Sequence, residues 1–173
     1  MGEETYREDD RLGSAPGKTV LETRRLRMAP ASDEEMERLV VAEADEETQA
    51  AYGEMRMGCR NYPAQRLWYA AWMVSRPDGA MVGDFCFKGP AVEGMVEIGY
   101  GMRPEYEGQG YATEAVQAAV AWALAQPGVQ GVEAETEPQN RASQRVLEKC
   151  GFVPNGKRGA EGPRFVRWGK GNE

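Results

Sequence analysis

Two glycines stand directly before a helix-forming run in the stretch EYEGQGYATEAVQAAVAWALAQ, residues 105–126. The start of a helix leaves about four backbone N–H groups without partners and carries roughly half a positive charge, so it attracts anions. Gly108 and Gly110, followed by the small Ala112, would let a phosphate approach these groups directly. The stretch lacks the Lys-Ser/Thr of a P-loop and the G-x-G-x-x-G of a dinucleotide turn, so by itself it also fits a tight turn that needs glycine.

The sequence contains no histidine. Nucleophilic systems of the Ser-His-Asp and Cys-His types are therefore excluded as normally built, and so are histidine-ligated metals. Any proton transfer must use carboxylates, tyrosine, lysine, cysteine or water. Cys59, Cys86 and Cys150 are widely spaced without a C-x-x-C pair, so neither a disulfide framework nor a metal site is indicated. A reducing cytoplasm fits this cysteine usage best.

Composition predicts one domain and limits its partners. The 173 residues suffice for a single core. The net charge of −7 argues against nucleic acid as the main partner and slightly favours a cationic one. No apolar run approaches the roughly 18 residues of a membrane span, and the acidic N-terminus does not resemble a signal peptide. We expect residues 1–17 to form a flexible polar tail and residues 18–173 a single domain.

The order of expected elements indicates an α+β domain. A strand is expected over residues 21–28, and Ser32 with Glu35 forms a capping box that starts a helix. Over residues 44–65 we expect short helical pieces and loop, because glycine and proline interrupt the pattern. The remaining expected elements are strands at 67–74, 80–88 and 95–102, a helix after Gly110, a strand at 131–137, a helix over 140–150 and two closing strands.

A wider string identifies a family. EIGYGMRPEYEGQGYATEAVQAAVAWAL, followed by EPQNRASQRVLEKCGFV, closely resembles the GNAT superfamily of acetyl-CoA-dependent N-acetyltransferases, in particular the branch that acetylates N-terminal amines of ribosomal proteins. The resemblance covers about residues 21–168, with two motifs in the right order. It implies a mixed, mostly antiparallel, V-shaped sheet flanked by helices, acetyl-CoA as co-substrate, and a monomer or homodimer.

The resemblance also implies which residues contact the cofactor. Backbone N–H groups in the glycine turn should hold the CoA diphosphate, and the strand that ends at Met102 should hydrogen-bond the pantetheine arm. Asn140 matches the asparagine that contacts the pantetheine. The residues of the turn are Gln109, Gly110, Tyr111 and Ala112.

Two positions depart from the family pattern. Glu107 stands where Gln or Arg is common, and its acidic side chain is expected to point into solvent. Leu147 stands seven residues after Asn140, where many relatives carry a tyrosine general acid. The proton for the departing CoA thiolate must then come from elsewhere. Ser143, or a water held by it, is the expected source.

A free alkylamine is protonated at neutral pH, so acetyl transfer to it needs a base. Glu97 lies on the strand before the glycine turn and is the first candidate, although a solvated strand face explains it equally well. Glu133, Glu135 and Glu137 alternate along the next strand. They form a solvated sheet face, or one of them helps bind a cationic acceptor or serves as the base; water is a further candidate base. The thioester carbonyl would be polarised by a backbone N–H near residues 99–102.

The favoured function is transfer of an acetyl group from acetyl-CoA to a primary amine by direct attack in a ternary complex. A non-catalytic acyl-CoA-binding regulatory domain is the alternative, and a phosphate-binding module unrelated to CoA is a weaker one. The acceptor stays open among protein N-termini, aminoglycosides, polyamines and small amino-acid amines.

Overall fold

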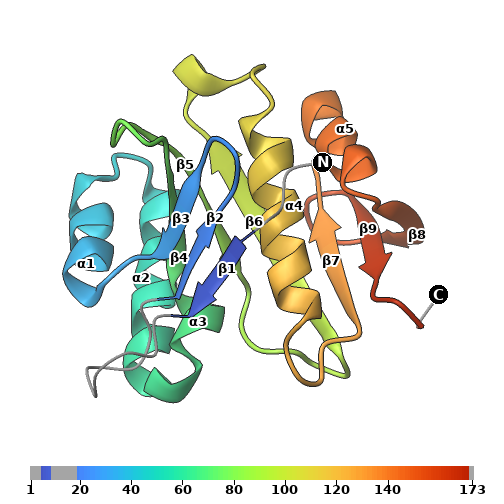
Figure 1. Ribbon diagram of the computed structural model, residues 1–173, viewed down its shortest axis with the longest axis horizontal. Helices are drawn as coiled ribbons and strands as arrows, with labels where there is room; N and C mark the ends of the chain where they lie inside the picture. The colour runs from blue at the N-terminus through green and yellow to red at the C-terminus, as the bar shows by residue number, and fades with distance from the viewer. Residues whose placement is uncertain (1–4, 9–18, 172–173) are drawn as a thin grey trace.

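Nine strands form one sheet across residues 5–8 and 19–171, which the computed structural model describes (Figure 1). Their order across the sheet is β1-β2-β3-β4-β5-β6-β7-β9-β8. Every neighbouring pair is antiparallel except β6 and β7, which are parallel. The strands are β1 (Thr5–Glu8), β2 (Thr19–Glu22), β3 (Arg27–Pro30), β4 (Ala71–Ser75), β5 (Met81–Phe87), β6 (Met95–Met102), β7 (Gly131–Glu135), β8 (Val153–Arg158) and β9 (Pro163–Trp168). The expected mixed, mostly antiparallel sheet is therefore confirmed.

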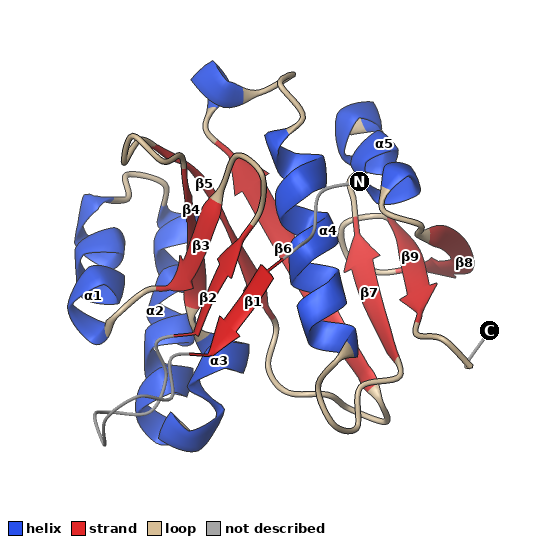
Figure 2. Cartoon of the chain, in the orientation of Figure 1, coloured by secondary structure: helices blue, strands red, loops and turns tan. Residues whose placement is uncertain are grey.

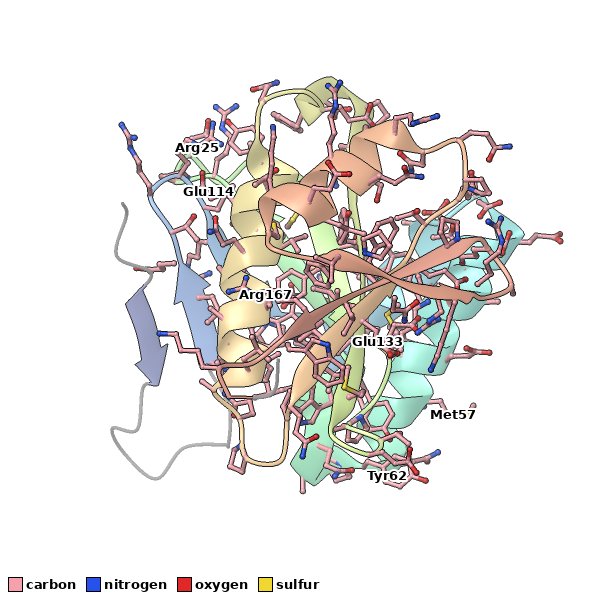
Figure 3. The ribbon with its side chains drawn as sticks, turned by 90° about the vertical axis from the view of Figure 1, so that its right-hand side faces the viewer. Arg25, Met57, Tyr62, Glu114, Glu133 and Arg167 are labelled. Atoms are coloured by element: carbon pink, nitrogen blue, oxygen red, sulfur yellow. The ribbon has the colours of Figure 1, made fainter. Side chains whose placement is uncertain are left out.

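Helices cover both faces of this sheet (Figure 2). On one face α4 lies along β6 and β7, with α5 packed against it, and on the other face lie α1 and α2 (Figures 1 and 3). The helices are α1 (Asp33–Ala42), α2 (Glu46–Asn61), α3 (Arg66–Tyr69), α4 (Tyr111–Leu124) and α5 (Arg141–Lys149), with short 3-10 turns at Pro63–Gln65 and Pro104–Tyr106.

Aromatic packing between α4 and the sheet forms the centre of the core. The ring centroid of Trp72 lies 5.3 Å from that of Phe85 and 5.2 Å from that of Trp122 in α4. Phe87 lies 5.6 Å from Trp122. These large apolar side chains are almost fully buried, and their removal from water is the main force that fixes α4 on the sheet.

The parallel strands β6 and β7 stay together for only part of their length. They pair from Met95–Glu97 with Gly131–Glu133. Beyond Glu97, β6 continues to Met102 while pairing with β5 on its other edge, and β7 continues while pairing with β9. The two halves of the sheet therefore part after Glu97, which gives the expected V shape.

The expected single strand over residues 21–28 is wrong, because a turn divides it into β2 and β3. The N–H of Thr23 donates to the carbonyl oxygen of Leu26 at 2.9 Å, and the N–H of Leu26 donates to Thr23 Oγ1 at 3.1 Å. The strands then pair antiparallel, with Leu21 opposite Met28. The turn contains neither glycine nor proline, the residues that usually mark one in a sequence.

The prediction of short helical pieces over residues 44–65 is also wrong, because α2 runs unbroken from Glu46 to Asn61. Asp45 caps its start by accepting from the N–H of Thr48 at 2.9 Å. Gly58 lies inside this helix because a Cβ there would come within 2.7 Å of Tyr69 Cγ. The glycine that suggested a break instead allows α3 to pack closely against α2.

Two smaller expectations need correction. The strand expected over residues 67–74 begins only at Ala71, because Arg66–Tyr69 form α3. Within the expected tail of residues 1–17, Thr5–Glu8 form strand β1, which pairs antiparallel with β2. The edge of β2 has backbone N–H and C=O groups that another strand can pair with. The rest of that segment lies outside the described residues, and the domain boundary at residue 18 stays a prediction.

The predicted helix ends are confirmed. The N–H of Glu35 donates to Ser32 Oγ at 3.1 Å and the N–H of Ser32 donates to Glu35 Oε1 at 3.3 Å, which is the capping box expected at the start of α1. Asn140 caps α5, and Gly151 follows the helix with a φ of 84°, the left-handed stop expected of glycine.

Alanine at the two glycines of α2 should have opposite effects. Gly58→Ala should lower the free energy of unfolding by about 1–3 kcal/mol, because its Cβ must displace the Tyr69 ring. Gly53→Ala is the matched control: apart from its chain neighbours and the nearby backbone of its own helix, no described atom lies within 4 Å of its would-be Cβ, so helix propensity should raise stability by up to about 1 kcal/mol. Thermal unfolding measures both, and stabilisation by both variants would contradict the packing role of Gly58.

Candidate active site

The turn before α4 has the backbone geometry of an anion-binding loop. Gly108 and Gly110 both adopt left-handed conformations, with φ of 75° and 83°. Side-chain-bearing residues adopt this conformation only at a cost. Gly110 is the N-cap of α4, and in the described part of the chain no side chain caps this helix. The N–H groups of its first turn can therefore serve a ligand.

The surroundings of this loop fit the diphosphate of CoA. Residues 107–110 are exposed, and a Cβ added at Gly108 would meet no described atom within 4 Å. Glu107 is itself exposed, as expected. Tyr111 is buried and Ala112 half-buried at the helix start. Backbone N–H groups at a helix start are well suited to bind a phosphate group, and the glycines of this loop have no side chain of their own to obstruct it.

The predicted strand contact lies beside this loop. Met102 is the last residue of β6 and stands opposite Gly83 of β5. The other edge of β6 faces the side from which β7 has separated. Backbone groups along residues 98–102 are thus unpaired with β7, and an extended amide-containing chain could pair with them as a further strand would.

The helix α5 brings the two other predicted residues to the same opening. Oδ1 of Asn140 accepts from the N–H of Ser143 at 3.0 Å, which fixes the amide side chain at the helix start. Ser143 Oγ lies 2.8 Å from Tyr100 Oη of β6. The same tyrosine hydroxyl lies 3.2 Å from the carbonyl oxygen of Ser143. The first turn of α5 is therefore connected directly to the free part of β6.

Tyr100 is a candidate functional residue that the sequence analysis missed. Its spacing groups it with Val96 and Ile98 as a core residue, and 43 residues separate it from Ser143. Burial raises the pKa of Tyr100, and the hydrogen bond with Ser143 offsets only part of this effect, so the phenol is protonated at neutral pH. Leu147, at the position of the usual tyrosine acid, is fully buried in the core.

Glu97 lies at the last paired position of β6, within a network of ion pairs. Its Oε2 lies 2.8 Å from Lys88 Nζ, and its Oε1 lies 2.6 Å from Arg164 Nη2. Arg164 also pairs with Glu133 at 3.0 Å and with Glu135 at 2.8 Å. Glu133 is labelled in Figure 3, beside the crossing of the closing strands. Three carboxylates thus share one guanidinium.

These partners determine how Glu97 can act. Burial raises the pKa of Glu97, but the hydrogen bonds and charges of Lys88 and Arg164 outweigh it, so the pKa is lowered overall. The carboxylate is therefore ionised at neutral pH, and it takes up a proton less readily than a free glutamate. Glu137 does not join this network, because β7 ends at Glu135 and Glu137 is exposed beyond it.

Tyr100 and Glu97 lie on opposite faces of the sheet, because Tyr100 comes three positions after Glu97 along β6 and successive side chains alternate between the faces. Tyr100 faces α5. On the other face, Tyr52 of α2 donates to Asp84 Oδ2 at 2.6 Å, and Asp84 stands opposite Gly101, which shares the face of Glu97. A proton donor and a carboxylate therefore approach the strand opening from its two sides.

Residues 23–153 match the family described as the acetyltransferase (GNAT) domain. The chain belongs to the GNAT acetyltransferase family. The matched range includes the glycine turn, β6, β7 and α5, so the family resemblance recognised in the sequence is confirmed over these elements, whereas Arg164 lies beyond the match.

Curated relatives in this family come from Bacillus. The uncharacterized N-acetyltransferase YjdG of Bacillus subtilis is 36% identical over 91 residues, which are 51% of this chain and 54% of the relative. The uncharacterized N-acetyltransferase YoaA of the same species is 27% identical over 149 residues, 79% of this chain and 84% of the relative. The alignment with YjdG thus spans about half the length of that relative.

Solved GNAT structures share the fold. The ribosomal-protein-S5-alanine acetyltransferase of Vibrio fischeri superposes with a TM-score of 0.70 at 14% identity, over 89% of this chain and 98% of that one. The aminoglycoside acetyltransferase AAC(6')-Ib, solved with coenzyme A, gives 0.63 at 17% identity, over 83% and 94%. The expected GNAT fold is therefore confirmed. Among the helices of the described residues, none has the length and apolar character to cross a membrane.

Removal of the shared guanidinium should make stability depend on pH. Arg164→Gln leaves three nearby carboxylates without their common cation, so we expect the free energy of unfolding at pH 7 to fall by about 1–3 kcal/mol. Without the guanidinium, mutual repulsion among the carboxylates should favour proton uptake by the folded variant. The deficit should therefore shrink as the pH is lowered from 7 to 5.

Urea unfolding at pH 7 and pH 5 measures this effect, with exposed Arg158→Gln as the control. In the unaltered protein Glu97 has a lowered pKa, so its stabilising contribution is present at neutral pH and is lost only as the pH falls through that lowered value. A deficit for Arg164→Gln that grows at pH 5 would contradict the shared ion-pair network.

Proposed function

We propose that this protein transfers the acetyl group of acetyl-CoA to a primary amine, either a protein N-terminus or a small amine, within a ternary complex. The observation that carries the proposal is the uncapped start of α4 beside the unpaired edge of β6, in a chain of the GNAT family. In this proposal the turn binds the diphosphate through backbone N–H groups, and the β6 backbone and Asn140 bind the pantetheine arm. The proposed cofactor-binding residues are Met102, Gln109, Gly110, Tyr111, Ala112 and Asn140.

The state of the cysteines favours direct attack over an acetyl-cysteine intermediate. Burial raises the pKa of Cys86 to about 11, so this thiol is protonated at neutral pH. Cys150 is 2% exposed at the end of α5, where its thiol donates to the carbonyl oxygen of Thr113 at 3.4 Å. A nucleophilic cysteine needs an accessible thiolate, which neither position offers.

Ser143 is the proposed proton donor to the leaving sulfur. Its O–H bond would break as the S–H bond of CoA forms, and water would then return a proton to Ser143 Oγ. Tyr100 supports this role because its hydroxyl, 2.8 Å away, can donate to the same oxygen and stabilise the charge that develops there. Ser143 and Tyr100 together would donate the proton that many relatives supply from a tyrosine at the position of Leu147.

Glu97 is the proposed base on the amine side. Since both of its oxygens already accept from cations, we propose that it removes the amine proton through a water rather than by direct contact. Glu133 and Glu135 share its cation and are the alternative carboxylates. The thioester carbonyl would accept from a backbone N–H near residues 99–102.

A cationic acceptor would enter from the face that α2 covers. A hollow of about 430 Å³ lies there, with Glu43, Tyr52 and Asp84 in its lining. Burial raises the pKa of Asp84, although the hydrogen bond from Tyr52 and the charge of Arg103 oppose this. A positively charged amine would favour the ionised form of Asp84. We further propose that the enzyme acts in the cytoplasm as a monomer or homodimer.

Turnover tests the proposed function. The protein is incubated with acetyl-CoA and separately with spermidine, kanamycin and peptides that begin with serine or alanine, and release of the CoA thiol is followed. We expect amine-dependent release with at least one of these acceptors. Tight acetyl-CoA binding without release in any mixture would favour the alternative, a non-catalytic acyl-CoA-binding regulatory domain.

Variants of the proposed donor pair should separate chemistry from binding. Ser143→Ala and Tyr100→Phe should each lower kcat by about a hundredfold, with acetyl-CoA affinity within about twofold of the unaltered protein. The double variant should be little worse than either single one, because the two hydroxyls act together. Glu97→Gln should lower kcat similarly.

The exposed Tyr62→Phe serves as a control for loss of a phenol hydroxyl and should leave kcat unchanged. Steady-state kinetics and calorimetric titration provide the two readouts. Unchanged kcat in Ser143→Ala and Glu97→Gln would show that these catalytic assignments are wrong, even though the family is right.

A further inference from the structure

A guanidinium from the turn between β2 and β3 reaches the glycine loop. Arg25 Nη1 donates to the carbonyl oxygen of Gln109 at 3.0 Å. Its Nη2 lies 3.3 Å from the place that a Cβ on Gly110 would take, and its Cζ lies 4.5 Å from the ring centroid of Tyr111. One side chain thus touches three consecutive residues of the proposed diphosphate loop.

The first turn of α4 holds this arginine in place. Glu114 Oε1 accepts from Arg25 Nε at 2.8 Å, and Glu114 Oε2 accepts from the backbone N–H of Arg25 at 2.9 Å and from Thr23 Oγ1. Figure 3 shows Arg25 and Glu114 together beside the start of the helix. Because these hydrogen bonds fix both the backbone and the Nε group of Arg25, they also fix the direction of its two Nη groups.

The bond to Gln109 determines where the next N–H points. No peptide bond among the described residues is cis, and a planar trans peptide directs its C=O and N–H to opposite sides. Because the guanidinium holds the carbonyl oxygen of Gln109, the N–H of Gly110 in the same peptide points away from the guanidinium. Successive N–H groups directed to one side form an anion-binding concavity.

We propose that Arg25 is a positioning residue for the CoA diphosphate, which orients the Gln109–Gly110 peptide so that the loop is preorganised before the cofactor binds. The inference rests on the proposed function, since it assumes that this loop binds CoA. It also explains how the loop tolerates Glu107, an acid where the family commonly has Gln or Arg. The fold places Arg25, which lies 84 residues before Gln109 in the chain, beside the same loop as a cation.

Calorimetric titration with acetyl-CoA, 3′-dephospho-CoA and S-acetylpantetheine tests this role. Arg25→Gln should weaken binding of the first two, which carry the diphosphate, by about tenfold, and should leave S-acetylpantetheine unchanged. Arg25→Lys keeps the charge but cannot hold Gln109 and Glu114 at once, so it should lose nearly as much. Arg24→Gln removes an exposed charge from the same turn and should change affinity less than twofold.

Several outcomes would overturn the proposal. If Arg25→Gln binds acetyl-CoA as tightly as the unaltered protein does, Arg25 only links the turn between β2 and β3 to α4. If Arg25→Gln loses affinity for acetyl-CoA alone, Arg25 contacts the 3′-phosphate instead. If it also loses affinity for S-acetylpantetheine, the substitution damages the whole site. If Arg25→Lys keeps full affinity, only the charge of Arg25 matters. If the unaltered protein binds none of these ligands, the proposed function fails together with this inference.

Discussion

The parting of β6 and β7 after Glu97 is the constraint on which the rest of the site depends. Parallel strands normally hydrogen-bond along their whole length, because unpaired backbone groups are costly unless something else satisfies them. Here β5 and β9 hold the outer edges of the two strands, so the inner edges can separate without loss of the sheet. The first turn of α5 meets this opening through Ser143, and α4 packs along β6 and β7. Its edges therefore offer backbone donors and acceptors to an extended ligand.

Charge is distributed unevenly around this opening, and the distribution suits acyl transfer to an amine. The loop side presents backbone N–H groups to an anion, and Arg25 holds the carbonyl oxygen of Gln109 in the same loop. The α5 side presents neutral hydroxyls, Tyr100 and Ser143, where a thiolate would leave. The α2 side presents carboxylates where a cationic amine would arrive. Although the whole chain is acidic, the local arrangement places groups of different charge on different sides of the opening.

Local signals in the sequence predicted the elements that local chemistry determines. The capping box at Ser32, the stop at Gly151 and the glycine turn before α4 follow from short-range hydrogen bonds and backbone freedom, and all appear in the structure. Gly58 misled the prediction because tertiary packing, not helix termination, requires it. Tyr100 and Arg25 were missed for a similar reason: each gains its role from a contact 43 or 84 residues away, and no spacing rule records such a contact. The family resemblance supplied the candidate cofactor residues, whereas the residues that contact them became visible only in the fold.

The most direct measurement is a crystal structure of the protein with CoA bound. We expect the diphosphate oxygens within hydrogen-bond distance of the N–H groups of residues 109–112, and the pantetheine arm between β6 and β7 with its amides paired to the free edge of β6. The CoA sulfur should lie near Ser143 Oγ. Diphosphate density elsewhere on the molecule, or β6 and β7 closed over an empty opening while CoA is bound, would contradict the assignment of this site.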